Sequence, residues 1–523
     1  MSKMLKSSGA LGAATLTSRV LGLVREIVYA RFMGDGWVAG AFMLAFMVPN
    51  LFRRLLGEGA LTAAFIPIFK EKEKLEGEQE MWQAARAVIS ALLIGASGII
   101  ALGIIIISII LASGRVEVGK TLLMLELLRI MFPYVLLVCL AAIFMGMLNS
   151  RGHFFVPAIG ATMLNLVMIA SVLWLAPRMG AALDQQIKGL AIGVVVAGFV
   201  QAFFQSPLLR KEGFRYQWVS PFGNDTVRRV VRQMLPATLG VAAYQLNVMF
   251  TQGLAFWVDA GVVASFQYAV RLMELPQGVF GLSLATYLLP TLSGMAAEKK
   301  YPEFRSTLGQ GLGYLVFINL LASVLLLTLA EPMIRLLLER GKFHEDSTMR
   351  ASLALACLAP GLVAYSVVNI LARAFYALSD TTTPMKISVF CLVLNAVFTL
   401  ALVWQFKQVG LGVANSVTAM VNMILLFVAL RKKLGKLELA DLMRHLPSLL
   451  GSAFVAGVVA WSLAGYWTRQ FGHANLWTRI GEVFLPMTAA SLIYFGLAWW
   501  LKVPFLKDLG NMVPGRLRRF LRK

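Results

Sequence analysis

The chain has 523 residues, of which 59% are hydrophobic and only 14% are charged. Its apolar runs are longer and more numerous than a water-soluble core requires, which excludes a soluble globular protein and indicates a chain that crosses a membrane many times. The 48 Lys and Arg outnumber the 26 Asp and Glu, so the net charge is +22. In a soluble protein this excess would suggest nucleic acid, but here most bases lie in short connections and at the C-terminus, where they orient membrane helices.

Apolar stretches of about 20 residues predict an all-α polytopic membrane protein with fourteen spans. Polar residues and Arg19 interrupt the first stretch, which favours a spanning helix over a cleaved signal peptide. An even number of spans places both termini on one side. About 29 of the 48 basic residues lie on that side and about 11 on the other, so we expect both termini in the cytoplasm. The predicted spans are residues 9–31, 38–69, 87–112, 122–148, 155–176, 189–209, 232–257, 262–295, 308–330, 352–378, 385–405, 411–430, 447–467 and 482–501.

Prolines and short motifs recur at equal intervals in the two halves of the chain. Pro133 and Pro157 are 24 residues apart, as are Pro360 and Pro384. "GLAIG" at 189 leads to "LRK" at 209, and "GLGVA" at 410 leads to "LRK" at 430. This repeat predicts two parallel six-helix lobes around a central cavity, with their symmetry axis along the membrane normal. The predicted lobes cover residues 1–215 and 225–435, followed by two further helices within 447–502 and a basic cytoplasmic tail, 503–523.

Four arginines fall well inside predicted spans: Arg19, Arg25, Arg53 and Arg271. With a rise of 1.5 Å per residue, Arg19 lies roughly 15 Å deep, near the middle of a 30 Å hydrocarbon core. A charge there costs roughly 2.5–3.5 kcal/mol on insertion scales, so it needs a salt-bridge partner or a functional role. Arginines that face the symmetry axis would form a cationic cavity suited to a phosphate. Arg31, Arg129 and Arg373 stand near span ends or turns, where a boundary position explains them more simply.

Local spacing predicts how some of these charges are compensated. Glu26 follows Arg19 by seven residues and lies almost in line with it on a helix. Arg54 and Glu58 have the i,i+4 spacing of an ion pair, which would leave Arg53 as the less neutralised charge. Arg271 and Glu274 have i,i+3 spacing, ahead of Pro276.

Signals of catalysis or metal binding are missing from the sequence. No Walker, HExxH, GxSxG or paired-carboxylate loop occurs, so we expect no catalytic residues, no metal ligands and no cofactor. Cys139, Cys357 and Cys391 stand alone in apolar segments and are expected to pack there. Asp380 in "LSDTTTP" is most simply a helix cap, with a coupling-cation site as the alternative.

Three stretches closely resemble the MurJ (MviN) family of lipid II flippases, which belongs to the multidrug/oligosaccharidyl-lipid/polysaccharide exporter superfamily. They are "SRVLGLVRE" at 18–26, "VPNLFRRLLGEGALTAAFIP" at 48–67 and "RLMELPQGVFGLSLATYLLPTLS" at 271–293, and the resemblance covers the full chain. It implies transport, without covalent chemistry, of the undecaprenyl-diphosphate-linked peptidoglycan precursor across the bacterial inner membrane by alternating access. Arg19, Arg25, Arg53 and Arg271 match the family's substrate-binding arginines, and Glu26 matches its following acid.

The same resemblance implies that the last two helices form a groove for the lipid tail. We expect a monomer whose partners are lipid II and membrane lipids, with proteins of peptidoglycan synthesis as further candidates. The sequence departs from the family at three positions: Gly40, Met47 and Val270 stand where relatives often have Asp, Lys and Asp. Two acids and one base are therefore missing, which would make the expected cavity more positive than in relatives.

Other functions stay open at this stage. A flippase for another polyprenyl-diphosphate-linked oligosaccharide would carry the same arginines. A cation-coupled multidrug exporter of the superfamily is disfavoured, because those exporters have twelve helices and usually acidic cavities. A membrane glycosyltransferase would need an acidic catalytic loop outside the membrane, and the sequence has none.

Overall fold

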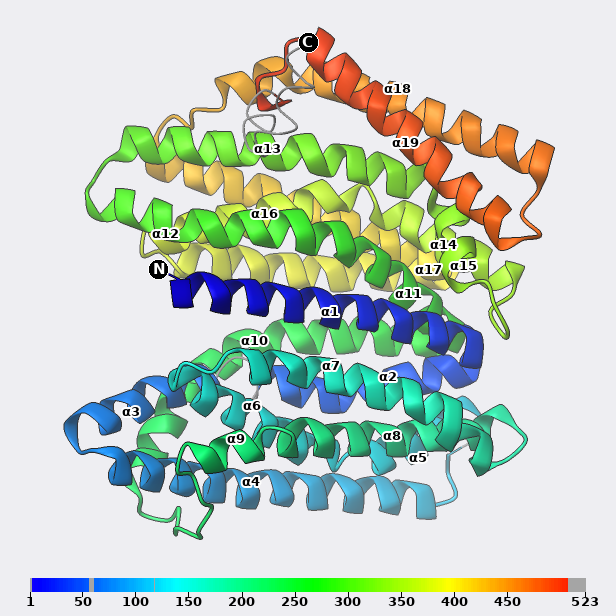
Figure 1. Cartoon of the computed structure of the whole chain (residues 1–523). Coiled ribbons are helices and arrows are strands. Elements are labelled where there is room, and N and C mark those ends of the chain that lie inside the picture. Colours follow the sequence, from blue (N-terminus) through cyan, green and yellow to red (C-terminus); the bar gives the residue numbers. More distant parts are fainter. Residues whose placement is uncertain (1, 56–60, 117, 507–523) are drawn as a thin grey trace. The chain divides into compact units, whose positions relative to one another are not determined.

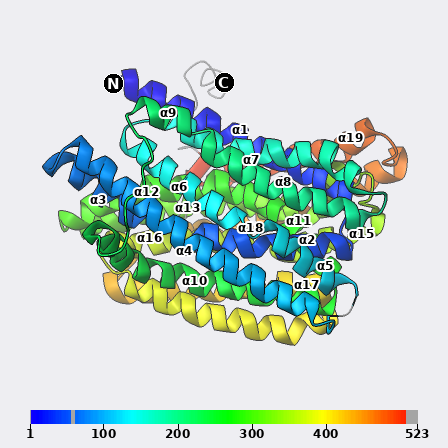
Figure 2. The ribbon, with the colours of Figure 1, turned by 90° about the horizontal axis from the view of Figure 1, so that it is seen from below.

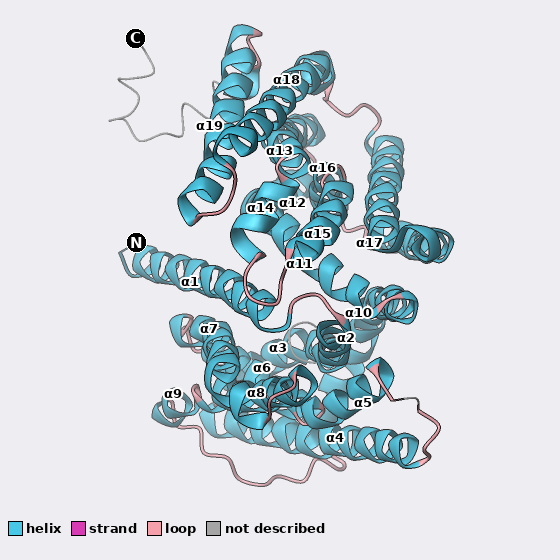
Figure 3. Ribbon diagram, turned by 90° about the vertical axis from the view of Figure 1, so that its right-hand side faces the viewer, coloured by secondary structure: helices cyan, strands magenta, loops and turns pink. Residues whose placement is uncertain are grey.

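The computed structural model describes residues 2–55, 61–116 and 118–506, and these form helices and connections with no strand among them (Figure 3). The predicted all-α class is therefore confirmed. The chain divides into two compact units. Unit 1 comprises the residues up to Ala264 together with Arg340–Phe343, and unit 2 comprises Ser265–Glu339 and the residues from His344 onward.

Unit 1 contains the elements from α1 to α10 and the start of α11. They are α1 (Ser2–Met33), α2 (Trp37–Phe52), α3 (Leu61–Leu75), α4 (Glu78–Ala112), α5 (Lys120–Met131), α6 (Tyr134–Ser150), α7 (Phe155–Ala170), the π-helical η2 (Ser171–Leu175), the 3-10 turn η3 (Ala176–Met179), α8 (Leu183–Phe203), α9 (Ser206–Lys211) and α10 (Asp225–Val258).

Unit 2 contains most of α11 and the elements that follow it. They are α11 (Ala260–Pro276), the π-helical η4 (Gln277–Leu282), α12 (Ser283–Ala297), α13 (Tyr301–Thr328), α14 (Ala330–Leu338), α15 (Glu345–Leu358), α16 (Gly361–Ala377), α17 (Thr382–Leu434), α18 (Ala440–Phe471) and α19 (Leu476–Trp500).

Eight of the described helices are long and apolar enough to cross a membrane, or up to ten if each of two bent pairs counts as one span. The predicted count of fourteen therefore stays a prediction. Two predicted spans are interrupted after a proline, because proline removes a backbone donor and crowds the preceding turn. In the span predicted at 38–69, Pro49 precedes π-helical residues 53–55. In the span predicted at 262–295, Pro276 precedes η4.

The proline repeat corresponds to a repeated bend. α5 and α6 meet at 42°, and α15 and α16 meet at 47°. Pro133 and Pro360 occupy the N-cap positions of α6 and α16 with nearly the same backbone angles, φ −58° and −60°. Each second helix then ends in a four-residue turn whose second residue has positive φ: Gly152 at 86° and Ser379 at 58°.

The two turns are also closed by equivalent backbone hydrogen bonds and by one polar side-chain contact each. His153 N–H donates to Leu148 O at 2.9 Å, and Asp380 N–H donates to Phe375 O at 2.9 Å. The side chain of His153 lies 2.8 Å from Glu212, just after the first "LRK". The side chain of Asp380 lies 2.6 Å from Lys433, just after the second "LRK". In each half, the turn is therefore joined to the helix end that carries "LRK". In the first half the turn supplies the base, His153, and in the second half it supplies the acid, Asp380.

Hydrogen bonding lowers the pKa of both carboxyls in these turns. His153 and then Arg151 lower the pKa of Glu212 by hydrogen bonding to it. Lys433, followed by the backbone N–H of Thr383, lowers the pKa of Asp380 to about 2. The bond from Thr383 N–H to Asp380 Oδ1, 3.0 Å long, is the capping interaction that the sequence predicts at this position.

The element α17 is two helices rather than one. Lys407 within it has φ 46° and ψ −123°, which is not helical, so the chain breaks there. The break falls between the spans predicted at 385–405 and 411–430, and it separates them into two helices of ordinary membrane-spanning length.

Packing within each unit follows the apolar faces of its helices. In unit 1, α1 packs on α7, and α10 packs on α2, α3 and α4 (Figure 2). A cluster of aromatic side chains including Phe65, Phe69, Trp82 and Phe214 fills the core beside α3 and α4. In unit 2, α18 and α19 form a hairpin that packs on α13 through α18 (Figure 1).

Candidate functional site

Arg25 lies on α1, inside unit 1, and contacts three different groups. Its Nη2 lies 2.5 Å from Glu26 Oε1, and its Nη1 donates to Asn165 Oδ1 on α7 at 2.9 Å. The guanidinium also lies over the ring of Tyr29, 5.4 Å from its centroid. Asn165 itself donates to Ser18 O at 3.2 Å, so its amide joins α7 to α1 at two points.

Only some of the hydrogen-bond donors of Arg25 are engaged by other groups of the protein. Its side chain is 15% exposed, and in the described part of the chain Glu26 is the one carboxylate with which it forms an ion pair. Its buried Nε makes no hydrogen bond there. A guanidinium with a remaining donor and a single carboxylate neighbour retains the capacity to bind an anion. Glu26 pairs with Arg25, its neighbour in sequence, whereas its spacing had suggested alignment with Arg19.

The other predicted arginines of unit 1 lie on α1 and at the end of α2. Arg19 is exposed, and no ion pair to it is found among the described residues. Arg53 is the C-cap residue of α2 and begins the π-helical stretch after Pro49. Arg54 lies beside it and donates from Nη1 to Gln245 Oε1 on α10 at 3.5 Å. Glu58, the predicted partner of Arg54, lies outside the described residues.

Arg271 lies on α11 in unit 2. Its Nη1 is 2.9 Å from Glu274 Oε2, and the two side chains are 40% and 46% exposed. An exposed ion pair of this kind contributes little to stability. The predicted arginines are thus divided between the units, three in unit 1 and one in unit 2. The common cavity stays a prediction.

The structure gives a physical reason for the glycine at position 40. Gly40 on α2 is buried, and a Cβ atom there would lie 1.9 Å from the carbonyl oxygen of Ala260. Any side chain at this position requires the backbones of α2 and of the start of α11 to separate. An Asp side chain therefore does not fit this arrangement either. Nothing in the structure explains Met47 or Val270.

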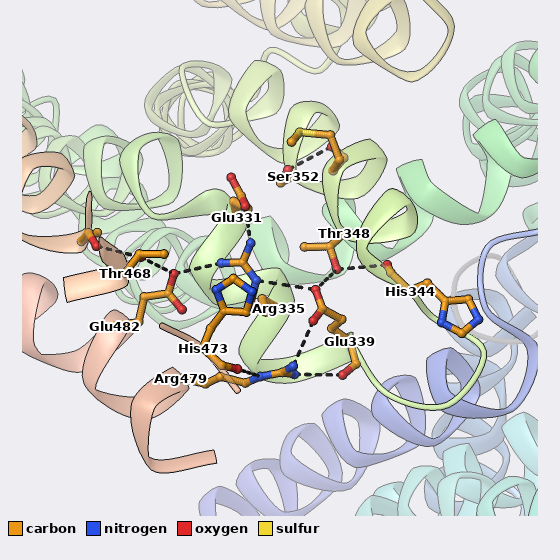
Figure 4. A network of polar contacts seen from close by, with 12 residues as sticks. Glu331, Arg335, Glu339, His344, Thr348, Ser352, Thr468, His473, Arg479 and Glu482 are labelled. Atoms are coloured by element: carbon orange, nitrogen blue, oxygen red, sulfur yellow. Dashed lines mark hydrogen bonds and ion pairs between the residues drawn. The ribbon is translucent and has the colours of Figure 1, made fainter. Parts of the chain in front are cut away.

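A buried arginine, Arg335 on α14, was not anticipated from the sequence (Figure 4). Its side chain is 4% exposed and contacts three carboxylates. It forms short contacts with Glu331 on its own helix, lies 2.9 Å from Glu482 on α19, and lies 3.6 Å from Glu339. The side chain of Glu482 is 2% exposed. The sequence signal was the i,i+4,i+8 spacing of Glu331, Arg335 and Glu339, which places them on one helical stripe.

Further contacts extend this network to the connection between α18 and α19 (Figure 4). Arg479 Nη2 lies 3.0 Å from Glu339, and its Nε donates to His473 O at 2.8 Å. Thr468 Oγ1 donates to Glu482 at 2.9 Å. The network therefore holds the α18–α19 hairpin to α14, and its arginines are already engaged by protein groups.

No group of His, Cys, Asp and Glu in the described part of the chain is arranged to hold a metal ion. Cys139 and Cys391 are buried and Cys357 is partly buried; none of the three is in a disulfide. The coupling-cation alternative for Asp380 finds no support in its contacts, which are Lys433 and Thr383.

The fold is that of a helical membrane transporter. A solved structure described as the inward-facing conformation of a multidrug resistance MATE family transporter of the MOP superfamily matches with a TM-score of 0.67 and 15% identity, over 81% of this chain and 96% of that one. Another, described as lipid II flippase MurJ in an inward closed conformation, matches with a TM-score of 0.74 and 22% identity, over 93% of this chain and 98% of that one.

Sequence relatives narrow this class to one family. The model of the family described as lipid II flippase MurJ matches residues 29–480. The probable lipid II flippase MurJ of Vibrio cholerae is 32% identical over 519 residues, 96% of each chain. The lipid II flippase MurJ of Burkholderia cenocepacia is 32% identical over 495 residues, 93% of this chain and 95% of that one. The chain belongs to the MurJ family, and the resemblance seen in its motifs is confirmed.

Proposed function

We propose that this protein is a transporter that moves lipid II from the cytoplasmic to the periplasmic leaflet of the bacterial inner membrane, in support of peptidoglycan synthesis. Family membership over nearly the whole chain supports the substrate. The apolar helices support a multi-pass location in the membrane. The alternative is a different polyprenyl-diphosphate-linked oligosaccharide, which shares the same diphosphate and lipid tail.

Arg25 is the observation that carries this proposal. A diphosphate needs cationic hydrogen-bond donors that the protein has not already saturated, and Arg25 combines partial burial with a single carboxylate contact and a donor that makes no hydrogen bond. Partial burial strengthens its attraction for an anion, because the surroundings screen charge less than water does. Arg19, Arg53 and Arg271 would supply further positive charge along the path of the head group.

Substrate movement then follows from alternating exposure of this cationic site. The head group enters from the cytoplasm, its phosphates bind the arginines bidentately, and the two lobes rock to open the site outward. No bond is made or broken. The lipid tail stays in the bilayer, beside the apolar side chains that α18 and α19 expose, among them Phe454, Trp461, Leu492 and Trp499.

Rescue of bacteria depleted of their own lipid II flippase tests the function and the arginines together. The unaltered chain is expected to restore growth. Arg19→Ala, Arg25→Ala, Arg53→Ala and Arg271→Ala are each expected to weaken or abolish rescue, because a charge-assisted hydrogen bond contributes about 1.5–3 kcal/mol, or roughly 10- to 100-fold. Arg129→Ala, an exposed arginine at the end of α5, is the matched control and should rescue.

Failure of the unaltered chain to rescue would overturn the function, and rescue by all four cavity variants would overturn the site. Competition in reconstituted vesicles separates the two substrates. Purified lipid II should compete for transport better than another polyprenyl-diphosphate-linked oligosaccharide.

The orientation proposed for the chain has both termini in the cytoplasm, as the distribution of basic residues suggests. A reporter that is active only in the cytoplasm, fused to the C-terminus, should be active. A periplasmic signal from the same fusion would reverse the orientation.

A further inference from the structure

The connection between α9 and α10, residues 212–224, lies along the N-terminal part of α4 and passes beneath it in Figure 1. Phe214 is buried against Trp82, with ring centroids 5.5 Å apart. Arg86 Nε donates to Arg215 O at 2.9 Å. Ser90 Oγ lies 3.2 Å from the Tyr216 hydroxyl and accepts from Val219 N–H at 3.4 Å. These contacts hold a non-helical segment at a defined level along α4.

That level is the edge of the bilayer. Arg86 is the last charged residue of α4, and the 26 residues from Ala87 to Ala112 carry no charge. A hydrocarbon core of about 30 Å takes up about 20 residues of helix. Ser90 therefore lies near the boundary between hydrocarbon and head groups, on the side predicted to be cytoplasmic. Tyr216 and its neighbours lie at the same depth, because they contact Ser90.

The end of α9 and this connection expose both aromatic and basic side chains. Tyr216, Trp218 and Phe222 are 43%, 61% and 78% exposed. Arg210, Lys211 and Arg215 are also exposed, and no ion pair to them is found in the described part of the chain. The neighbouring acid, Glu212, is engaged by His153 and Arg151 and does not compensate them. Aromatic rings prefer the interface, and basic residues there attract anionic lipid.

We propose that Arg210, Lys211, Arg215, Tyr216, Trp218 and Phe222 form a surface that binds the anionic phospholipid head groups of the cytoplasmic leaflet. The aromatic rings enter the interfacial layer and the three bases contact the phosphates. This fastens the connection between the predicted lobes to the membrane surface at a fixed depth. The surface is separate from the substrate arginines, and the proposal does not depend on which lipid the protein transports.

The repeat provides a matched control. The second "LRK", at 430–432, also ends a helix and exposes Arg431 and Lys432. It continues as "KLGKLELAD", without aromatic residues, so it supplies charge without an interfacial anchor.

Hydrogen–deuterium exchange of the full-length protein tests the proposal, in nanodiscs that contain no lipid II. The discs hold either phosphatidylcholine alone or phosphatidylcholine with phosphatidylglycerol. Amides of residues 215–222 are expected to exchange at least about fivefold more slowly in the anionic discs, the factor that one base near an anionic surface contributes. High salt should reduce this difference in exchange rate, because salt screens the attraction between the basic side chains and the anionic head groups.

The variants assign the effect to this surface. Arg210→Gln/Lys211→Gln/Arg215→Gln should remove the difference between the two lipids, and Arg431→Gln/Lys432→Gln should preserve it. Trp218→Ser/Phe222→Ser should speed exchange in both kinds of disc. Equal exchange of the unaltered protein in the two lipids overturns the proposal, and that comparison needs no variant to fold. Protection that appears only when cell lysate is added would also overturn it, because the partner would then be a protein.

Discussion

Arg25 in unit 1 and Arg335 in unit 2 are both arginines in apolar helices, yet their charges are compensated in different ways. Arg335 is 4% exposed and contacts three carboxylates, one of them on another helix. Arg25 is 15% exposed, pairs with one carboxylate, and otherwise contacts a neutral amide and an aromatic ring. An arginine saturated by carboxylates holds helices together. An arginine that contacts a single carboxylate and keeps a donor without a hydrogen bond can still bind an anion.

Removing Arg335 should have the largest effect on stability. Arg335→Met leaves Glu482 buried without its cation, and breaking a buried ion pair in this way costs about 3–5 kcal/mol. Thermal unfolding, followed with a dye that reacts with the buried cysteines, should show a marked fall in midpoint. Arg335→Met/Glu482→Met should recover part of the loss. Compared with Arg335→Met, Arg25→Met should lower the unfolding midpoint less and should reduce lipid II transport more. The reverse ranking would contradict the division of roles between the two arginines.

A side chain at Gly40 should have the next largest effect. Gly40→Ala places a Cβ against the carbonyl oxygen of Ala260, and overpacking of this kind typically costs about 1–3 kcal/mol. Gly36→Ala is the control, because nothing lies within 4 Å of a Cβ at that position. Gly40→Asp adds a carboxylate to the same strain. If Gly40→Ala is as stable as the Gly36 control, the close approach of α2 and α11 is not maintained.

Asn165→Asp tests whether the number of carboxylates in contact with Arg25 decides its role. The substitution keeps the shape of Asn165 and puts a second carboxylate 2.9 Å from Arg25 Nη1, as in the surroundings of Arg335. Transport of lipid II in vesicles is expected to fall about tenfold, because the substrate phosphate then competes with a built-in anion. Asn165→Leu, which removes the amide without adding charge, should reduce transport less. Equal losses for the two variants would show that the amide matters rather than the charge.

The smallest effect is expected at the Asp380 turn, outside the apolar helices. The pKa of Asp380 is lowered to about 2 by Lys433 and Thr383, from an ordinary value of 3.8. A lowered pKa means that the ionised form stabilises the folded state above about pH 4, and that this contribution is lost as the pH falls towards 2. Asp380→Asn should therefore cost about 0.5–1 kcal/mol at neutral pH.

Unfolding midpoints measured across the pH range provide the check on Asp380. The variant and the unaltered protein should begin to converge below about pH 4 and should coincide only below the folded-state pKa, at about pH 1. A gap that persists at about pH 1 would assign the effect to packing instead of charge.

The sequence by itself determined the features that depend on neighbouring residues. Hydropathy is a local sum, so the apolar runs already indicated a helical membrane protein. Proline acts on its own turn, so the equal spacing of Pro133, Pro157, Pro360 and Pro384 predicted a repeat that appears as two similar bends. The arginines were visible because a charge in an apolar run is exceptional.

Tertiary structure decided which groups these charges meet. Arg25 bonds to Asn165, 140 residues away, and Arg335 bonds to Glu482, 147 residues away. The close approach behind Gly40 is likewise a contact between distant helices. The physical reason is that the partner of a buried charge can lie on a different helix. The sequence pattern gives only the spacing of residues along the same helix.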